Sequence, residues 1–145
     1  MHRALQPVDA TTEGLVELAQ DVTAPEGLLF HHANEGRPLA TPWQIAALRA
    51  QLVAKHELPP GFLLDCACGS GIQLAAYGSI LQRPLLGVEL SNERAQASAV
   101  NIRTVAQHTR CGESAWYLES HIIAGDGTDP DGVIAALPNE GVEVA

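Results

Sequence analysis

The pattern of apolar and polar positions changes character near residue 61. From there onward, short apolar runs alternate with longer segments in which apolar residues recur every three or four positions. The short runs are typical of buried strands, and the longer segments are typical of amphipathic helices. Strands that alternate with helices form right-handed crossovers, which build a parallel sheet with helices on its two faces. Residues 61–145 are therefore predicted to form an α/β domain with a doubly wound parallel sheet.

Each element of this domain can be placed on the sequence. The helix that starts after Ser91 has a capping serine and an apolar face, which consists of Ala95, Ala99, Ile102 and Val105. The predicted strands cover 62–65, 84–90 and 121–124, and the predicted helices cover 72–81, 91–108 and 132–137. A fourth strand begins at Gly141, so we expect the sheet to be truncated and the C-terminal remainder of the protein to be missing from this chain.

Residues 1–60 are predicted to form an N-terminal helical extension. Thr11 or Thr12 is placed to cap a helix that continues to about Asp21. A second helix is predicted after Thr41, because the segment Thr-Pro-Trp-Gln has the spacing of a capping box with proline at the first helical position. Its apolar stripe is expected to lie on the sheet and consists of Ile45, Leu48 and Leu52.

Composition and charge narrow the class of protein. The chain of 145 residues is 46% hydrophobic and 17% charged, which is typical of a folded globular domain. Its net charge is −9 and Lys55 is its only lysine, so this segment is not expected to form a broad phosphate-binding face, although an RNA substrate is not excluded. The sequence has neither a long apolar run nor a signal peptide, which predicts a cytoplasmic protein without a membrane segment.

The three cysteines favour a reducing compartment, because their spacing is poor for a disulfide framework. Cys66 and Cys68 are one residue apart, and neither they nor the six histidines show a CxxC or HxxxH spacing. We therefore predict no metal site and interpret these cysteines as small loop residues of the core.

The segment from Asp65 to Gly71 carries the strongest functional signal. A strand that leads into a glycine-rich turn and then a helix is typical of a nucleotide-binding loop. The dinucleotide pattern GxGxxG is incomplete here, because Leu74 stands where the third glycine is expected. A carboxylate at the start of the loop would repel a pyrophosphate but attract a ligand with ammonium and sulfonium groups. S-adenosylmethionine is such a ligand.

Two further acids follow the next two predicted strands. Glu89 is placed to accept hydrogen bonds from both hydroxyls of a ribose, and Asp126 to accept one from an adenine amino group. Each acid also has a local interpretation: Asp65 as a cap, Glu89 as a solvated strand end, and Asp126 as an Asp-Gly turn residue. Because the ends of parallel strands meet at one edge of the sheet, we expect the three acids to line one crevice.

These segments resemble the first three motifs of the class I S-adenosylmethionine-dependent methyltransferases, which have a Rossmann-like fold. The resemblance covers residues 62–128 and rests on Leu-Leu-Asp-Cys-Ala-Cys-Gly-Ser-Gly, Gly-Val-Glu-Leu-Ser and Ile-Ile-Ala-Gly-Asp-Gly. It implies that the loop contacts the methionine moiety, although Ala67 departs from the more usual glycine. It also implies ribose and adenine contacts at the ends of the next two strands. The cofactor-binding residues that follow from it are Asp65, Ala67, Cys68, Gly69, Ser70, Gly71, Glu89, Leu90, Asp126 and Gly127.

A looser resemblance suggests the acceptor. The segments 37–44 and 99–101 are similar to RNA methyltransferase-like members of that family, including those with a THUMP-like domain. This resemblance implies RNA or another nucleic acid as substrate. Asn101, which belongs to the second segment, has an alternative interpretation as a polar residue on the exposed side of its helix. Family members place their acceptor with residues after the fourth strand. No catalytic residue is therefore assigned, and the chain is expected to be inactive alone.

Two other classes of protein stay open. One is an NAD(P)-dependent oxidoreductase domain, because nicotinamide sites also use an acid at the position of Glu89; Asp65 and Leu74 disfavour it. The other is a non-catalytic binding module that keeps the methyltransferase fold.

Overall fold

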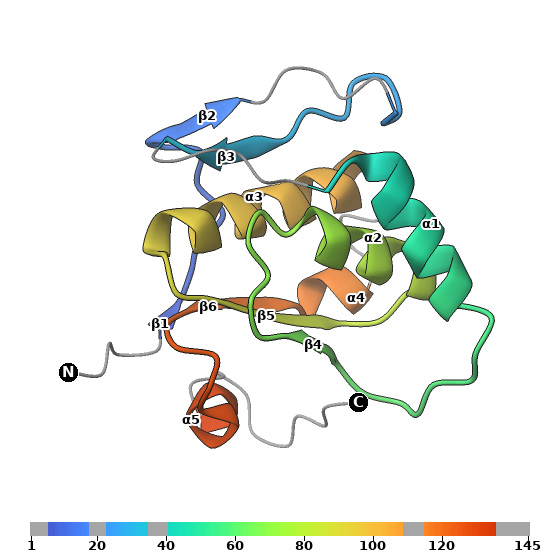
Figure 1. Ribbon diagram of the computed structural model, residues 1–145. Helices are drawn as coiled ribbons and strands as arrows, with labels where there is room; N and C mark the ends of the chain where they lie inside the picture. Colours follow the sequence, from blue (N-terminus) through green and yellow to red (C-terminus); the bar gives the residue numbers. More distant parts are fainter. Residues whose placement is uncertain (1–5, 18–22, 35–40, 109–114, 136–145) are drawn as a thin grey trace.

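The computed structural model describes residues 6–17, 23–34, 41–108 and 115–135. These residues form a four-stranded sheet with helices on both faces and a separate two-stranded sheet (Figure 1). Three parallel strands form the main part of the four-stranded sheet, in the spatial order β6-β5-β4, and a short antiparallel strand, β1, pairs with β6. The bounds are β1 Gln6–Pro7, β4 Leu63–Asp65, β5 Leu85–Glu89 and β6 His121–Ala124. The predicted α/β class with parallel strands is confirmed, whereas the predicted fourth strand lies outside the described residues.

The central strand β5 is buried along its whole length, and its alternate residues contribute to two cores. Leu85 belongs to the larger core, beneath α2 (Ile72–Leu81), α3 (Asn92–His108) and α4 (Ala115–Leu118). Leu86 and Val88 belong to a smaller core on the opposite face, where Val133 of α5 (Pro130–Ala135) contributes. The residues of β5 before Glu89 are apolar because both faces of the strand are covered.

The helices of this part agree well with the sequence-based expectation. The bounds of α2 are those predicted, and Ser91 Oγ accepts a hydrogen bond from the backbone N of Arg94 at the start of α3, at 3.3 Å. The predicted buried face of α3 is confirmed. Helix α5 begins two residues earlier than predicted, because Asp129 caps it by accepting a hydrogen bond from the N–H of Gly132. Within the described ranges, no helix has the length and apolar character that a membrane span requires.

The N-terminal region is not the helical extension that the sequence predicts. Leu15–Glu17 (β2) pairs antiparallel with His31–Ala33 (β3), so the helix predicted from Thr11 or Thr12 is wrong in its described part. Gly14, with φ of 78°, interrupts any helical run before β2. Backbone hydrogen bonding to β3 then replaces the intrahelical bonds that a helix would have made.

Helix α1 (Trp43–Val53) is present as predicted, but its cap and its buried face differ. No side chain caps it from its own N-cap residue, and the N–H of Gln44 instead donates to Thr23 Oγ1 at 3.1 Å. Its fully buried residues are Ala46 and Ala50, because α1 packs beside α2 rather than on the sheet (Figure 1). Small residues allow this close helix–helix contact. The predicted stripe is exposed instead, by 41%, 50% and 50% at Ile45, Leu48 and Leu52.

Candidate functional site

The three acids follow three adjacent parallel strands, as predicted. Asp65 and Glu89 are the last residues of β4 and β5, and Asp126 lies two residues beyond β6. The register pairs Asp65 with Gly87 and Glu89 with Ala124. The structure therefore places all three acids at the carboxyl edge of the sheet, where ligands of open α/β sheets bind.

Each acid also makes a local hydrogen bond, which agrees with the alternative interpretations of Asp65 as a cap and Asp126 as a turn residue, whereas the buried Glu89 is not the solvated strand end of its alternative interpretation. Asp65 Oδ1 accepts a hydrogen bond from the N–H of Ala67 at 3.0 Å, and Glu89 Oε2 accepts one from the N–H of Ser91 at 2.7 Å. Asp126 Oδ1 accepts from both the N–H and the hydroxyl of Thr128, at 2.9 and 2.7 Å. These bonds engage one oxygen of each carboxylate. At Asp65 and Glu89, a turn role and a ligand role are therefore compatible.

Glu89 differs from the other two acids in its burial. Its side chain is only 9% exposed, whereas Asp65 and Asp126 are half-buried. The N–H of Ser91 and the nearby N-terminus of α3 both stabilise a negative charge at this place. A buried carboxylate held in this way is well suited to accept hydrogen bonds from neutral hydroxyl groups of a ligand.

The glycine loop is shaped by the helix that lies against it. Gly69 and Gly71 have φ values of 54° and 76°, in the left-handed region. A β-carbon at Gly71 would lie 2.8 Å from the backbone Cα of Ser98, so α3 leaves room only for glycine there. Gly71 is also the N-cap of α2, and no side chain caps that helix. The first amide groups of α2 therefore face the region where the loop turns.

Cys68 supports the loop from the core side. Its thiol is buried and accepts a hydrogen bond from Ser98 Oγ at 3.3 Å, and its N–H donates to the carbonyl of Val88. Burial, with a smaller contribution from the negative charges of Asp65 and Glu89, raises the pKa of the Cys68 thiol to about 12, although the hydrogen bond with Ser98 lowers it. The thiol of Cys68 therefore faces the core and not the candidate ligand site. Cys66, by contrast, is exposed.

The remaining predicted contact residues lie around the same loop. A β-carbon at Gly127 would lie 3.0 Å from Cys66 Cβ and closer still to its carbonyl oxygen, so the loops after β4 and β6 touch. Ala67 and Leu90 are exposed, and Ser70 is half-buried. The structure thus brings the predicted residues of all three loops to one edge of the sheet.

Asn101 is the residue of this region that sequence reasoning misjudged. Its side chain is fully buried, not exposed. Asn101 Nδ2 donates to the carbonyls of Ser70 and His31 at 2.8 and 2.9 Å, and Asn101 Oδ1 accepts from the N–H of His31 at 2.8 Å. One sequence signal could have indicated this burial. Ser98, Asn101 and Val105 recur at helical spacing and form a second buried stripe on α3.

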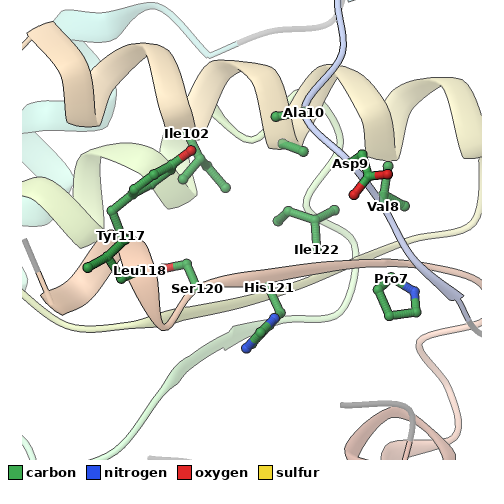
Figure 2. Close-up of a pocket in the computed structure, with 11 residues that line it drawn as sticks. Pro7, Val8, Asp9, Ala10, Ile102, Tyr117, Leu118, Ser120, His121 and Ile122 are labelled. Carbon is green, nitrogen blue, oxygen red and sulfur yellow. The ribbon is translucent and has the colours of Figure 1, made fainter. Parts of the chain in front are cut away.

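Two cavities are lined by residues other than the three acids, and no sequence motif had indicated them. The larger has a volume of about 270 Å³ and lies between α3, α4, β6 and the segment that follows β1 (Figure 2). In Figure 2, Ile102, Tyr117 and Ile122 surround it, and burial raises the pKa of Tyr117. The second has a volume of about 260 Å³ and shares Pro7, Val8 and Asp9 with the first. Its lining residues are Pro7, Val8, Asp9, Thr11, Asn92, Gln96 and Ala124.

In the described part of the chain, no three His, Cys, Asp or Glu side chains are grouped as a metal ion would require. No protein-family model, curated protein or solved structure matches this chain. The structure by itself defines a mixed α/β protein with a candidate ligand site at the carboxyl edge of its parallel strands.

Proposed function

We propose that this chain is the S-adenosylmethionine-binding part of a class I methyltransferase with a Rossmann-like fold. One observation carries the proposal: acids follow three adjacent parallel strands, and the first acid opens a glycine loop that leads into a helix. The sequence motifs that resemble this family are the segments that form this edge.

The position of Asp65 favours this cofactor over a dinucleotide. A pyrophosphate beside the glycine loop would face the carboxylate of Asp65, which begins the loop, and that of Glu89, which ends the neighbouring strand. Like charges at this edge of the sheet oppose binding. The amino acid end of S-adenosylmethionine carries an ammonium group and a sulfonium centre, which the same carboxylates attract.

The other two acids have roles that suit the nucleoside half of the cofactor. Glu89 would accept hydrogen bonds from the ribose hydroxyls, and Asp126 would accept one from the adenine amino group. Gly127 allows the backbone of the third loop to lie directly on the first loop, at Cys66. The ribose and the methionine moiety would therefore lie across neighbouring strand ends.

The chemistry is an in-line displacement at the methyl carbon. The bond from carbon to the acceptor nucleophile forms as the bond from carbon to sulfur breaks, and S-adenosylhomocysteine leaves. Much of the catalysis is therefore positioning. We propose RNA as the acceptor class, on the looser sequence resemblance. With a net charge of −9, this segment would not bind RNA through a broad basic face of its own.

Calorimetric titration with S-adenosylhomocysteine tests the cofactor assignment. We expect one site per chain, with affinity reduced about tenfold or more in Glu89→Gln, because a charged hydrogen-bond acceptor is lost. Glu119→Gln is the matched control, because Glu119 is an exposed acid next to α4 and outside the candidate site. Its affinity should equal that of the wild type.

The outcomes separate the alternatives. A folded wild-type chain that binds no S-adenosylhomocysteine would refute the proposal, and NADH binding by that chain would favour the oxidoreductase. Equal affinities of wild type and Glu89→Gln would remove the role given to Glu89. Binding of S-adenosylmethionine without methyl transfer to RNA would favour the non-catalytic module.

A further inference from the structure

Asn101 contacts two parts of the molecule that are far apart in the sequence. It bonds both backbone groups of His31 in strand β3 and the carbonyl of Ser70 in the glycine loop. Its amide thus makes three hydrogen bonds, all to backbone atoms, from a side chain with no exposed surface. The positions of the β2–β3 hairpin and of the glycine loop are therefore set by the same side chain.

Two other side chains of α3 that bond the N-terminal region, Gln96 and Glu93, contact only that region. Gln96 Nε2 donates to the carbonyls of Thr11 and Glu13, at 2.5 and 2.7 Å. Glu93 Oε1 accepts from the N–H of Asn34 at 2.5 Å. Helix α3 therefore holds the hairpin region through several side chains, and in Figure 1 the hairpin lies over this helix. Of these three side chains, Asn101 alone also holds the loop.

The burial of Asn101 makes the two sets of bonds depend on each other. A hairpin that moved away would leave the amide with unpaired groups in a buried place, and so would a shift of the carbonyl of Ser70. An unpaired buried polar group is unfavourable by about 1 to 3 kcal/mol. The arrangement in which both partners are in place is therefore favoured over either one alone.

We propose that Asn101 is a positioning residue that couples the β2–β3 hairpin to the glycine loop, so that order in one raises order in the other. A ligand that fixes the loop then also restrains the hairpin, and release of the hairpin weakens binding of that ligand by the same factor. The identity of the ligand rests on the proposed function, whereas the coupling between hairpin and loop does not.

Amide hydrogen exchange on the 145-residue chain without ligand tests the coupling directly. Asn101→Leu keeps a similar shape without hydrogen bonds, and Asn101→Asp keeps the acceptor but loses the donors. We expect both variants to exchange faster at His31, whose N–H donates to Asn101 Oδ1 in the wild type, and at Gly71, whose N–H donates to the carbonyl of Cys68. Global stability, from urea unfolding, is measured in parallel so that subglobal opening is distinguished from unfolding.

Gln96→Met is the matched control, because it removes a side-chain amide from the same helix without touching the loop. It should speed exchange at Leu15, whose N–H bonds to the carbonyl of Thr12, and leave Gly71 unchanged. Asn101→Asp adds a pH readout. At low pH its carboxyl becomes neutral and can donate one hydrogen bond again. At low pH, the Gly71 amide should therefore be better protected in Asn101→Asp than in Asn101→Leu. A purely steric role of residue 101 would give no such difference.

Addition of S-adenosylhomocysteine extends the test. In the wild type, the ligand should slow exchange at His31 by about fivefold or more, and in Asn101→Leu it should slow only the loop. If Asn101→Leu speeds exchange at His31 but not at Gly71, the coupling is refuted. If the wild type does not bind the ligand, the proposed cofactor fails, while the comparison of His31 and Gly71 without ligand still decides the coupling. Should Asn101→Leu fail to fold, Asn101→Asp carries the same comparison.

Discussion

The parallel unit β4–β6 and the β2–β3 hairpin are held in place by different forces. In the parallel unit, consecutive strands pair along ladders, and side chains such as Leu85, Val88 and Ile123 have no exposed surface. The hairpin is a short two-stranded ladder whose β2 side has exposed residues such as Val16, whereas Ala33 of β3 and the preceding Phe30 are buried. Polar side chains of α3 add specific hydrogen bonds to it. The unit is therefore fixed mainly by long ladders and buried strands, and the hairpin by apolar contacts on its β3 side together with these hydrogen bonds.

The difference sets what each region can do. Burial of a large aliphatic side chain stabilises the fold by about 1.5 to 3 kcal/mol, whereas a hydrogen bond contributes about 0.5 to 1.5 kcal/mol net. The unit is expected to open only in global unfolding, while the hairpin can open as a local event. A rigid strand edge next to a less stable hairpin is an arrangement in which a ligand at the edge can change the order of the hairpin.

The substitution Gly71→Ala should have the largest effect on stability, because Gly71 lies where α3 packs closely against the parallel unit. The added carbon would lie 2.8 Å from the Cα of Ser98, in a residue with φ of 76°. We expect a loss of about 2 to 4 kcal/mol in the free energy of unfolding. Urea denaturation measures it.

Gly69→Ala is the control for that experiment. Its φ of 54° is also left-handed, but no atom lies within 4 Å of the added carbon. The loss should be about 1 kcal/mol, from backbone strain alone. Equal losses at the two glycines would show that α3 does not constrain the loop.

Helix α1 sharpens the comparison, because it belongs to the N-terminal region but is held by apolar packing. Ala50→Leu should lower the free energy of unfolding by about 1 to 3 kcal/mol, since Ala50 has no exposed surface next to α2. Leu48→Gln, on the exposed stripe, should change it by no more than about 0.5 kcal/mol. Thermal melting of the two variants compares them. A larger loss for Leu48→Gln would mean that α1 buries the opposite face.

The smallest expected effect is the pH dependence that His121 contributes to the parallel unit. Its ring stacks on Phe62, and burial lowers its pKa below 6.5, so the folded chain favours the neutral ring. This contribution is present above pH 6.5 and is lost as the pH falls through the folded-state pKa. His121→Gln should therefore reduce the fall in stability between neutral and acidic pH. An unchanged pH dependence in that variant would exclude His121 as a source.

Much of the parallel unit could be predicted from local patterns. The bounds of β6 and α2 and the buried face of α3 follow from periodicity and from turn and cap residues, which act over a few positions. The positions of Asp65, Glu89 and Asp126 follow from the rule that parallel strands end at one edge. The residues of this edge could thus be named in advance.

The N-terminal region was harder to predict, because its partners are distant in sequence. β2 forms through pairing with β3, and the first turn of α1 is capped by Thr23 rather than by its own threonine. Which face of α1 is buried depended on α2 and its close contact with Ala46 and Ala50. None of these partners is visible in a local window.

The sequence by itself determined the order of strands and helices in the parallel unit and the acids that follow its strands, because periodicity and connection rules are local. Only the tertiary structure decided that Asn101 is buried and joins His31 to Ser70. The physical reason is that a polar side chain on a helix is read as solvated until two other segments, 70 and 31 residues away in the chain, supply its hydrogen-bond partners.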